Sequence, residues 1–194
     1  MRLIVGISGA SGIIYGIRLI QVLNQKNVEV DFVITHSAAK IIETETSIKA
    51  SYLAKLATRV HDVDNLFSPI ASGGFSNQGM VVIPCSMKTL AGIASGYSSN
   101  LLLRAADVTL KEKRRLVLVP RETPLNVLQL RNMLDLASVG AVILPAMPAY
   151  YHKPQTIEDL VDHIVGKVLD MFGIEHNLYE RWKGCANEVN SHIN

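Results

Sequence analysis

Short runs typical of β-strands alternate with segments of helical periodicity, and this alternation constrains the fold more than any other feature. The strand-like runs are residues 3–5, 28–35, 80–83, 116–119 and 141–144. The segments that predict helices are residues 13–25, 37–43, 52–58, 88–94, 98–113, 124–139 and 156–172. Strands that alternate with helices form parallel sheets, because each parallel connection needs a crossover element. We therefore expect an α/β fold in three layers, Rossmann-like or flavodoxin-like, with a central parallel sheet covered by helices on both faces.

Two of the expected helices carry residues that predict where they begin. Ser37 is the expected N-cap of helix 37–43, and Pro124 is expected in the first turn of helix 124–139, where a missing N–H is harmless. A chain of 194 residues can bury one sizeable core. Because no repeat or linker interrupts residues 1–183, we expect a single domain there and a polar tail at 184–194.

The balance of charge excludes several classes of partner. A net charge of +2 is too small to indicate a nucleic-acid-binding protein, and the basic residues cluster locally, which favours a site over a binding face.

Residues 3–17 are apolar, but glycines and serines interrupt them and they are too short to cross a bilayer. Cys85 and Cys185 form no disulfide framework, which is typical of a reducing compartment. We expect a cytoplasmic protein that binds neither nucleic acid nor membranes.

Metal and cysteine chemistry are not indicated either. The histidines are dispersed, and no Cys-x-x-Cys or His-Glu-x-x-His spacing occurs, so we expect no metal. Cys85 follows an apolar strand with no histidine nearby in sequence, which predicts a buried packing residue instead of a nucleophile.

Two turns that follow buried strands have the composition of phosphate-binding sites. Residues 6–12, GISGASG, predict a tight turn whose N–H groups and following helix dipole attract a phosphate. Their spacing fits neither the dinucleotide fingerprint nor a Walker loop, so a mononucleotide such as a flavin is favoured. In residues 84–89, PCSMKT, Ser86 is an expected N-cap, with Lys88 and Thr89 beside it. The plain alternatives are an ordinary glycine-rich turn and an ordinary serine cap.

A basic segment precedes the strongest candidate for catalysis. Arg104, Asp107 and Lys111 share one face of a helix, which for an arbitrary helix indicates only a solvated salt-bridge stripe. The next strand, however, delivers Arg121 and Glu122 at its carboxyl end, where ligands bind in open α/β sheets. A cation beside a carboxylate suits a small anion whose reaction also needs a proton moved.

Four segments in this order resemble the flavin prenyltransferase family of the UbiX type. They are GISGASG, PCSMKT, LLLRAADVTLKEKRRLVLVPRETPL and PAYYHKPQ, and the resemblance extends from Arg2 to about Trp182. It implies a flavoprotein domain that binds FMN and transfers a dimethylallyl group from dimethylallyl monophosphate to N5 and C6 of the reduced flavin without a metal. It also implies that the pocket forms between subunits of a homo-oligomer, commonly a dodecamer. The product, prenylated FMN, would serve a UbiD-type decarboxylase.

The resemblance assigns roles to individual residues. The implied FMN contacts are Gly9, Ala10, Ser11, Ser37, Ser86, Met87, Lys88, Thr89 and Arg121. The implied set around the substrate phosphate is Arg104, Lys111, Arg121, Glu122, Tyr151 and Lys167. Glu122 would manage protons, with help from Ser11, Lys111 and a carboxylate that is Glu45 or Glu43. Lys167 stands where relatives often have arginine, so it keeps the charge and loses the bidentate grip.

Three other functions fit parts of the pattern. A flavin-dependent cysteine decarboxylase needs an early catalytic histidine and an asparagine-rich motif where PCSMKT stands. A direct aromatic-acid decarboxylase and an FMN carrier without enzymatic activity are the others. A carrier leaves Lys111, Arg121 and Glu122 without a role.

Overall fold

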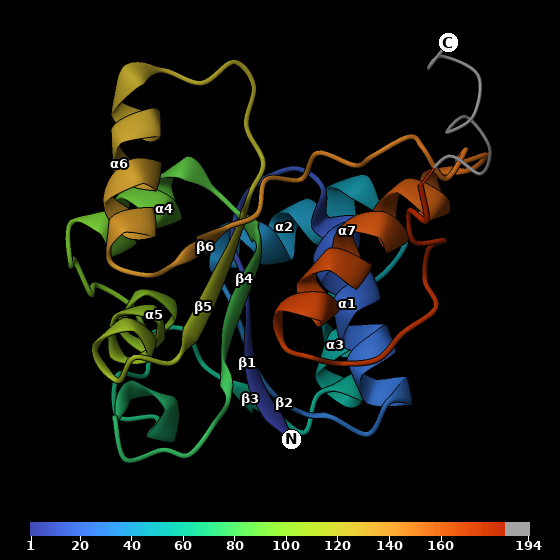
Figure 1. The fold of residues 1–194 in the computed structure, drawn as a ribbon. Coiled ribbons are helices and arrows are strands. Elements are labelled where there is room, and N and C mark those ends of the chain that lie inside the picture. The colour runs from blue at the N-terminus through green and yellow to red at the C-terminus, as the bar shows by residue number, and fades with distance from the viewer. Residues whose placement is uncertain (185–194) are drawn as a thin grey trace, which may run out of the picture.

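A six-stranded parallel sheet separates two layers of helices in the computed structural model, which describes residues 1–184 (Figure 1). The strand order is β3-β2-β1-β4-β5-β6, and every pairing is parallel. The strands are β1 (Arg2–Ile7), β2 (Glu29–Ile34), β3 (Arg59–His61), β4 (Gly79–Cys85), β5 (Arg115–Pro120) and β6 (Val142–Ile143). The predicted three-layer α/β fold is confirmed.

The helices pack on the two faces in separate groups (Figure 1). One face is covered by α1 (Ile13–Gln25), α2 (His36–Glu45), α3 (Ala50–Leu56) and α7 (Ile157–Met171). The other is covered by α4 (Met87–Ala94), α5 (Leu101–Lys111) and α6 (Val127–Ser138). Successive side chains of a strand point to opposite faces. In β4, Val81 and Ile83 accordingly join the first core, and Met80 and Val82 join the second.

Three predicted helix starts are wrong, because in each helix the residue that accepts from the first free N–H groups lies elsewhere than the sequence suggested. Thr35, and not Ser37, caps α2, since its Oγ1 accepts from the Ala38 N–H at 3.3 Å. Pro124 precedes α6, whose cap is Asn126. Helix α5 likewise starts later than predicted, after its cap Asn100.

Two further differences lie at the edges of the predicted elements. Strand β3 was not predicted, since it has only three residues, all at least partly exposed, and lies at the edge of the sheet. Helix α5 ends at Lys111, two residues earlier than the predicted end at residue 113, so Arg114 does not extend its last turn. Arg114 instead donates to the carbonyls of Gly73 and Phe75 at 2.7 Å each. Of the predicted tail, only Gly184 lies within the described residues.

The order of the strands reverses its direction between β1 and β4, which lie side by side at the centre of the sheet. Ligands of open α/β sheets bind outside the carboxyl ends of the strands at such a switch point. Both predicted phosphate-binding turns, residues 6–12 and 84–89, leave the sheet there. Within residues 1–184, no helix has the length and apolar character needed to cross a membrane.

Candidate functional site

The glycine-rich turn after β1 is held by a carboxylate from α2. Gly12 precedes α1 as its N-cap with a φ of 89°, and it has no side chain that could cap the helix. Glu45 supplies the cap, since its Oε2 accepts from the N–H groups of Gly12 at 2.9 Å and Ile13 at 3.2 Å. Burial would raise the pKa of Glu45, but hydrogen bonds from Ser11 and these two N–H groups outweigh it and lower the pKa. Glu45, and not Glu43, therefore reaches the glycine-rich turn, as a carboxylate.

A buried hydroxyl joins this turn to the turn after β4. Ser8 is fully buried, and its Oγ donates to the Pro84 carbonyl at 3.1 Å and accepts from the Ser86 N–H at 2.8 Å. The two predicted phosphate-binding turns are thus fixed to each other. Ser8 was not among the predicted site residues, although its place directly after β1 within the glycine-rich motif was a usable signal.

The turn after β4 presents the start of helix α4. Ser86 is the N-cap as predicted: its Oγ accepts from the Thr89 N–H at 3.2 Å and donates to Thr89 Oγ1 at 3.1 Å. Lys88 is exposed in the first turn of the same helix. Hydroxyls, an ammonium group and the positive end of a helix dipole therefore face the same side of the turn, an arrangement that attracts anions.

A cavity of about 840 Å³ opens beside these two turns. Of the predicted flavin contacts, it is lined by Gly9, Ser37, Ser86, Lys88 and Thr89. Thr35, Gly92, Tyr97 and Asn100 also line it and were not predicted. Tyr97 and Asn100 come from the connection between α4 and α5, which carries no motif. The loop geometry that places them is visible only in three dimensions.

Gly9 lies close to Ser37, in the first turn of α2. A Cβ atom at this position would lie 2.3 Å from Ser37 Oγ and 2.8 Å from Ser37 Cβ, distances that real Cβ contacts do not show. Ser37 in turn hydrogen-bonds Thr35, with 3.2 Å between the two hydroxyl oxygens. The absence of a side chain at Gly9 is thus required for the wall of the cavity that these hydroxyls form.

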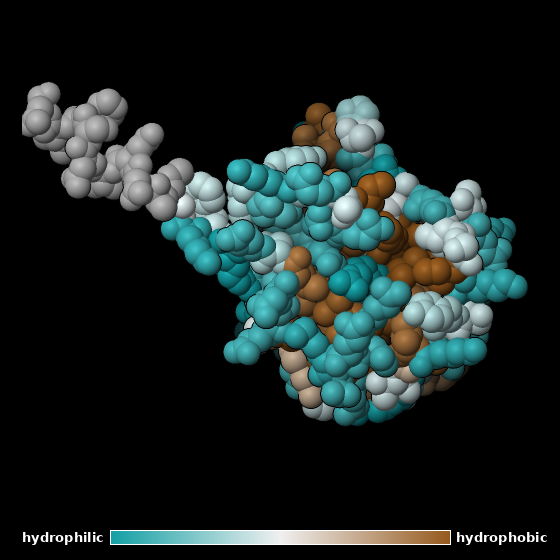
Figure 2. All heavy atoms as spheres, turned by 90° about the vertical axis from the view of Figure 1, so that its right-hand side faces the viewer, coloured by the Kyte–Doolittle hydropathy of each residue, from teal (hydrophilic) through white to brown (hydrophobic). Residues whose placement is uncertain are grey.

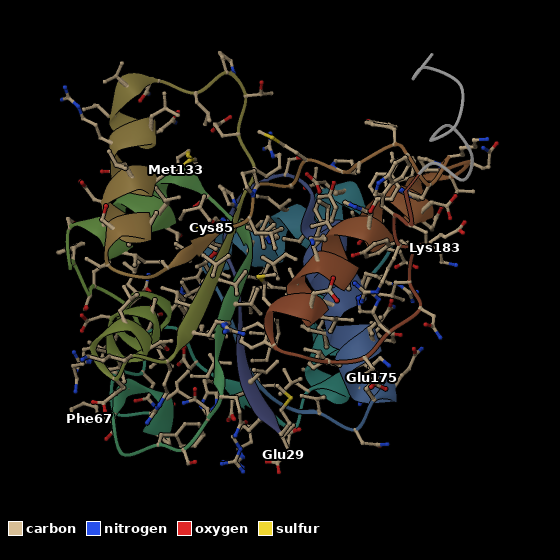
Figure 3. The ribbon with its side chains drawn as sticks, viewed as in Figure 1. Glu29, Phe67, Cys85, Met133, Glu175 and Lys183 are labelled. Carbon is tan, nitrogen blue, oxygen red and sulfur yellow. The ribbon has the colours of Figure 1, made fainter. Side chains whose placement is uncertain are left out.

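Arg121 and Glu122 leave the carboxyl end of β5 together and line a second cavity of about 440 Å³. Arg121 Nε donates to the Ser11 carbonyl at 3.0 Å, which ties the end of β5 to the glycine-rich turn. Glu122 Oε1 accepts from the Thr123 N–H at 3.1 Å. Met133 of α6, labelled in Figure 3, lines the same cavity, as do Pro145 to Met147 of the loop after β6. The structure therefore brings the predicted arginine next to the first turn.

Arg104 and Lys111 lie away from this group within one chain. Arg104 pairs with Asp107 at 2.7 Å, as the shared helix face suggested, and also donates to the Ala71 carbonyl. Lys111 pairs with Glu112 at the last turn of α5, next to the start of β5. Glu122 follows the end of that six-residue strand. A strand rises about 3.3 Å per residue, so Lys111 and Glu122 of one chain are separated by roughly 20 Å along the sheet.

Tyr151 and Lys167 lie on the α7 side of the molecule. Tyr151 makes edge-to-face contacts with His163 at 6.1 Å and Trp182 at 5.7 Å between ring centroids, and is 43% exposed. Lys167 lies one turn after His163 on α7 and is partly buried. Neither residue lines the two cavities described above, although the loop that carries Tyr151 continues from the wall of the second one.

Cys85 is buried at the end of β4, where Figure 3 shows it among packed side chains. Burial raises the pKa of its thiol to about 12, so it stays protonated at neutral pH. The prediction that Cys85 packs in the core is confirmed. Among residues 1–184, no group of three or more His, Cys, Asp or Glu side chains is placed to hold a metal ion.

Known proteins resemble this chain in both sequence and fold. The sequence profile of the flavoprotein family matches residues 1–169. The flavin prenyltransferase UbiX of Methanocaldococcus jannaschii is 48% identical over 182 residues, which cover 94% of this chain and 98% of that protein.

Two solved structures superpose closely. A dodecameric FMN-dependent UbiX-like decarboxylase from Escherichia coli O157:H7 has a TM-score of 0.93 and 50% identity, covering 95% of this chain and 100% of that one. AnUbiX (PadA1), solved in complex with FMN and dimethylallyl pyrophosphate, has a TM-score of 0.94 and 46% identity, covering 95% and 98%. On this evidence of sequence and structure the chain belongs to the flavoprotein family and, within it, to the UbiX-type flavin prenyltransferases.

Proposed function

We propose that this protein transfers the dimethylallyl group of dimethylallyl monophosphate to N5 and C6 of reduced FMN and releases phosphate. The observation that carries the proposal is that the two anion-attracting turns, residues 6–12 and 84–89, meet Arg121 and Glu122 at the switch point of the sheet. The serine- and lysine-bearing turns line one cavity, and Arg121 links them to Glu122 in the next. Its close relatives are flavin prenyltransferases by name.

The residues around the larger cavity fit FMN. The hydroxyls of Ser37, Ser86 and Thr89, with Lys88 and the start of α4, suit the phosphate of a mononucleotide. Gly9 presents bare backbone, over which a flat ring can lie closely. Ala10, Ser11, Met87 and Arg121 complete the proposed contacts from the same two turns and the end of β5. When bound, reduced FMN supplies the electron-rich ring that accepts the prenyl group.

The remaining residues of the proposed site act on the phosphate that leaves. A monophosphate is a poor leaving group, so cations must stabilise its developing charge. Arg121, Arg104, Lys111 and Lys167 are the proposed cations, and Tyr151 a hydrogen-bond donor. Glu122 is the proposed proton carrier, since it is exposed in the second cavity next to Arg121. Ser11 and Glu45, hydrogen-bonded to each other, hold the glycine-rich turn and with it the proton path.

We also propose that the complete site forms between subunits of a homo-oligomer. Two observations support this: Lys111 and Glu122 of one chain lie at opposite ends of the sheet, and α6 exposes a row of apolar side chains. Those that are at least half exposed are Val127, Leu128, Leu130 and Leu134. Brown apolar patches also interrupt the polar surface on the α7 side of the molecule (Figure 2). The relative from Escherichia coli is dodecameric, and we propose the same size here.

Mixing two inactive variants tests the shared site. Glu122→Gln and Lys111→Met subunits should each be nearly inactive alone. After the two are unfolded and refolded together, some sites combine Glu122 of one chain with Lys111 of another. Formation of prenylated FMN should then return to roughly a quarter of the wild-type rate, the statistical share of such sites in a random assembly. If the rate does not return in mixtures shown to co-assemble, Lys111 and Glu122 do not act together across subunits.

The mass of the flavin product tests the reaction itself. We expect purified protein, reduced FMN and dimethylallyl monophosphate under anaerobic conditions to yield a flavin heavier by one isoprenyl unit, with release of inorganic phosphate. An unchanged flavin with carbon dioxide released from an aromatic acid would instead establish the decarboxylase alternative. An unchanged flavin with neither product would favour the FMN carrier. The cysteine decarboxylase requires release of carbon dioxide from a peptide with a carboxyl-terminal cysteine.

The use of the product is a further part of the proposal. Prenylated FMN formed by this protein would pass to a UbiD-type decarboxylase. A cytoplasmic location, indicated by the sparse cysteines of the sequence, is the proposed setting for this transfer.

A further inference from the structure

Residues 149–153, the loop that carries Tyr151, make several contacts with one imidazole of α7. Among the described residues, the bond from the Ala149 N–H to His163 Nδ1, at 3.4 Å, is the only hydrogen bond that joins residues 147–152 to another helix or strand. Tyr151 also lies edge-on to the His163 ring, at 6.1 Å and 82°. His163 is only 6% exposed, so the loop covers it.

The neighbour of Tyr151 in the loop depends on the same ring. His152 stacks on His163 with 5.3 Å between centroids and 6° between planes. Both ring nitrogens of His152 are buried and have no hydrogen-bond partner among the described residues. Its position therefore rests on ring contacts, of which the stack on His163 is the closest. Three contacts, from Ala149, Tyr151 and His152, thus converge on the His163 side chain.

The surroundings of His163 favour its neutral form. Burial lowers its pKa, and electrostatic interactions with His152 and Lys167 lower it further. The Tyr179 ring also packs against His163, with 4.8 Å between centroids. Asp159 is the described carboxylate whose charge interacts with His152. Because Nδ1 accepts from Ala149, the neutral ring carries its proton on Nε2.

We propose that His163 is a positioning residue for Tyr151, which docks the loop of residues 149–153 on α7 while neutral and releases it when protonated. A proton on Nδ1 points at the Ala149 N–H, so the accepted hydrogen bond is lost. The imidazolium also stands beside Lys167 and against the stacked His152. The inference rests on the proposed role of Tyr151 at the substrate phosphate. Its consequence is that substrate binding weakens at acidic pH because His163 of the protein becomes protonated.

The sign of the pH dependence follows from the lowered pKa. A histidine whose pKa is lower in the docked state binds fewer protons there, so docking is favoured above its usual value of about 6.5 and is lost as pH falls below it. The second ionisation of a monophosphate, near pH 6, falls in the same range. A comparison of the wild-type protein with His163 variants separates the titration of His163 from that of the substrate, because the phosphate of the substrate titrates identically with each protein.

Trp182 gives a readout that does not depend on activity. It is the only tryptophan of the chain and lies edge-on to Tyr151, at 5.7 Å and 68°. Release of the loop should change its emission. In the full-length wild-type protein, with and without FMN, we expect a reversible fluorescence transition with its midpoint below pH 6.5.

Two substitutions of His163 separate hydrogen bonding from titration. His163→Asn keeps an acceptor close to the position of Nδ1 but does not titrate. His163→Phe keeps a ring without an acceptor. We expect both to lack the acid transition. At pH 8, His163→Asn should keep the KM for dimethylallyl monophosphate within about twofold, whereas His163→Phe should raise it roughly two- to tenfold, the effect of one hydrogen bond, with little change in kcat.

Several results would overturn the proposal. An acid transition of Trp182 that survives in His163→Asn would place the titrating group elsewhere, and its absence from the wild-type protein would show that the loop does not respond. His163→Asn, which also lacks the ring, with the raised KM of His163→Phe would show that the accepted hydrogen bond alone does not hold the loop. If His163→Phe fails to fold, the wild-type and His163→Asn titrations still decide. If no protein forms prenylated flavin, the proposed function fails, while the fluorescence still tests docking.

Discussion

Glu122→Gln should slow the formation of prenylated FMN by about a hundredfold or more, the usual contribution of a positioned proton carrier. The reason is that glutamine keeps the size and the acceptor oxygen of the side chain, which accepts from the Thr123 N–H, but carries no titratable proton. FMN affinity should stay within about twofold, because Glu122 lines the smaller cavity and not the one that fits the flavin. Single-turnover kinetics with reduced FMN, together with flavin titration, measure both effects.

A matched control is available on α2. Glu43→Gln removes one negative charge from an exposed position that reaches neither cavity, and the rate should be unchanged. Full turnover in Glu122→Gln would remove this carboxylate from the mechanism. An equal loss of FMN binding and turnover would instead assign it to the flavin site.

Gly9→Ala should weaken FMN binding by roughly five- to a hundredfold, because overpacking costs about 1–3 kcal/mol and each 1.4 kcal/mol is tenfold in affinity. The new methyl group would lie 2.3 Å from Ser37 Oγ. It would also lie 2.8 Å from Ser37 Cβ, a contact that rotation of the Ser37 side chain does not relieve, so the turn must move from α2. This movement breaks the wall that Gly9, Ser37 and Thr35 form. Equilibrium titration of the flavin-free protein, followed by flavin fluorescence, measures the loss.

Gly74→Ala is the corresponding control. Its added methyl group would meet only Ser72 Oγ, at 3.8 Å, and the position has an ordinary φ, so both the fold and FMN affinity should be unchanged. The thermal unfolding midpoint of Gly9→Ala distinguishes a local effect on the cavity from general destabilisation. Wild-type FMN affinity in Gly9→Ala would show that the flavin does not approach this part of the turn.

The local chemistry of the two turns could be predicted from the sequence because it depends on neighbours in the chain. Ser86 is the N-cap of α4, as expected from the residues that follow it. The cap of α2 was misassigned by two residues, since Thr35 and Ser37 are both good caps and only the backbone direction after β2 decides between them. Contacts between distant segments, such as Ser8 with Pro84 and Ser86, had no local signal.

The sequence also could not identify which carboxylate holds the glycine-rich turn. Glu43 and Glu45 are equivalent in the sequence, and the choice is made by which turn of α2 points at the start of α1. His163 had no sequence signal either. Its importance to the Tyr151 loop comes from packing α7 against a loop that ends ten residues before it.

By itself, the sequence determined the alternation of strands and helices, the buried strands, and the turns at their ends, because hydrophobic periodicity and capping act over a few residues. Tertiary structure alone decided which of these ends meet. It placed Arg121 on Ser11, Glu45 on the start of α1 and Lys111 at the far end of the sheet from Glu122. The physical reason is that strand order and crossover direction set these distances, and both arise from the packing of whole layers.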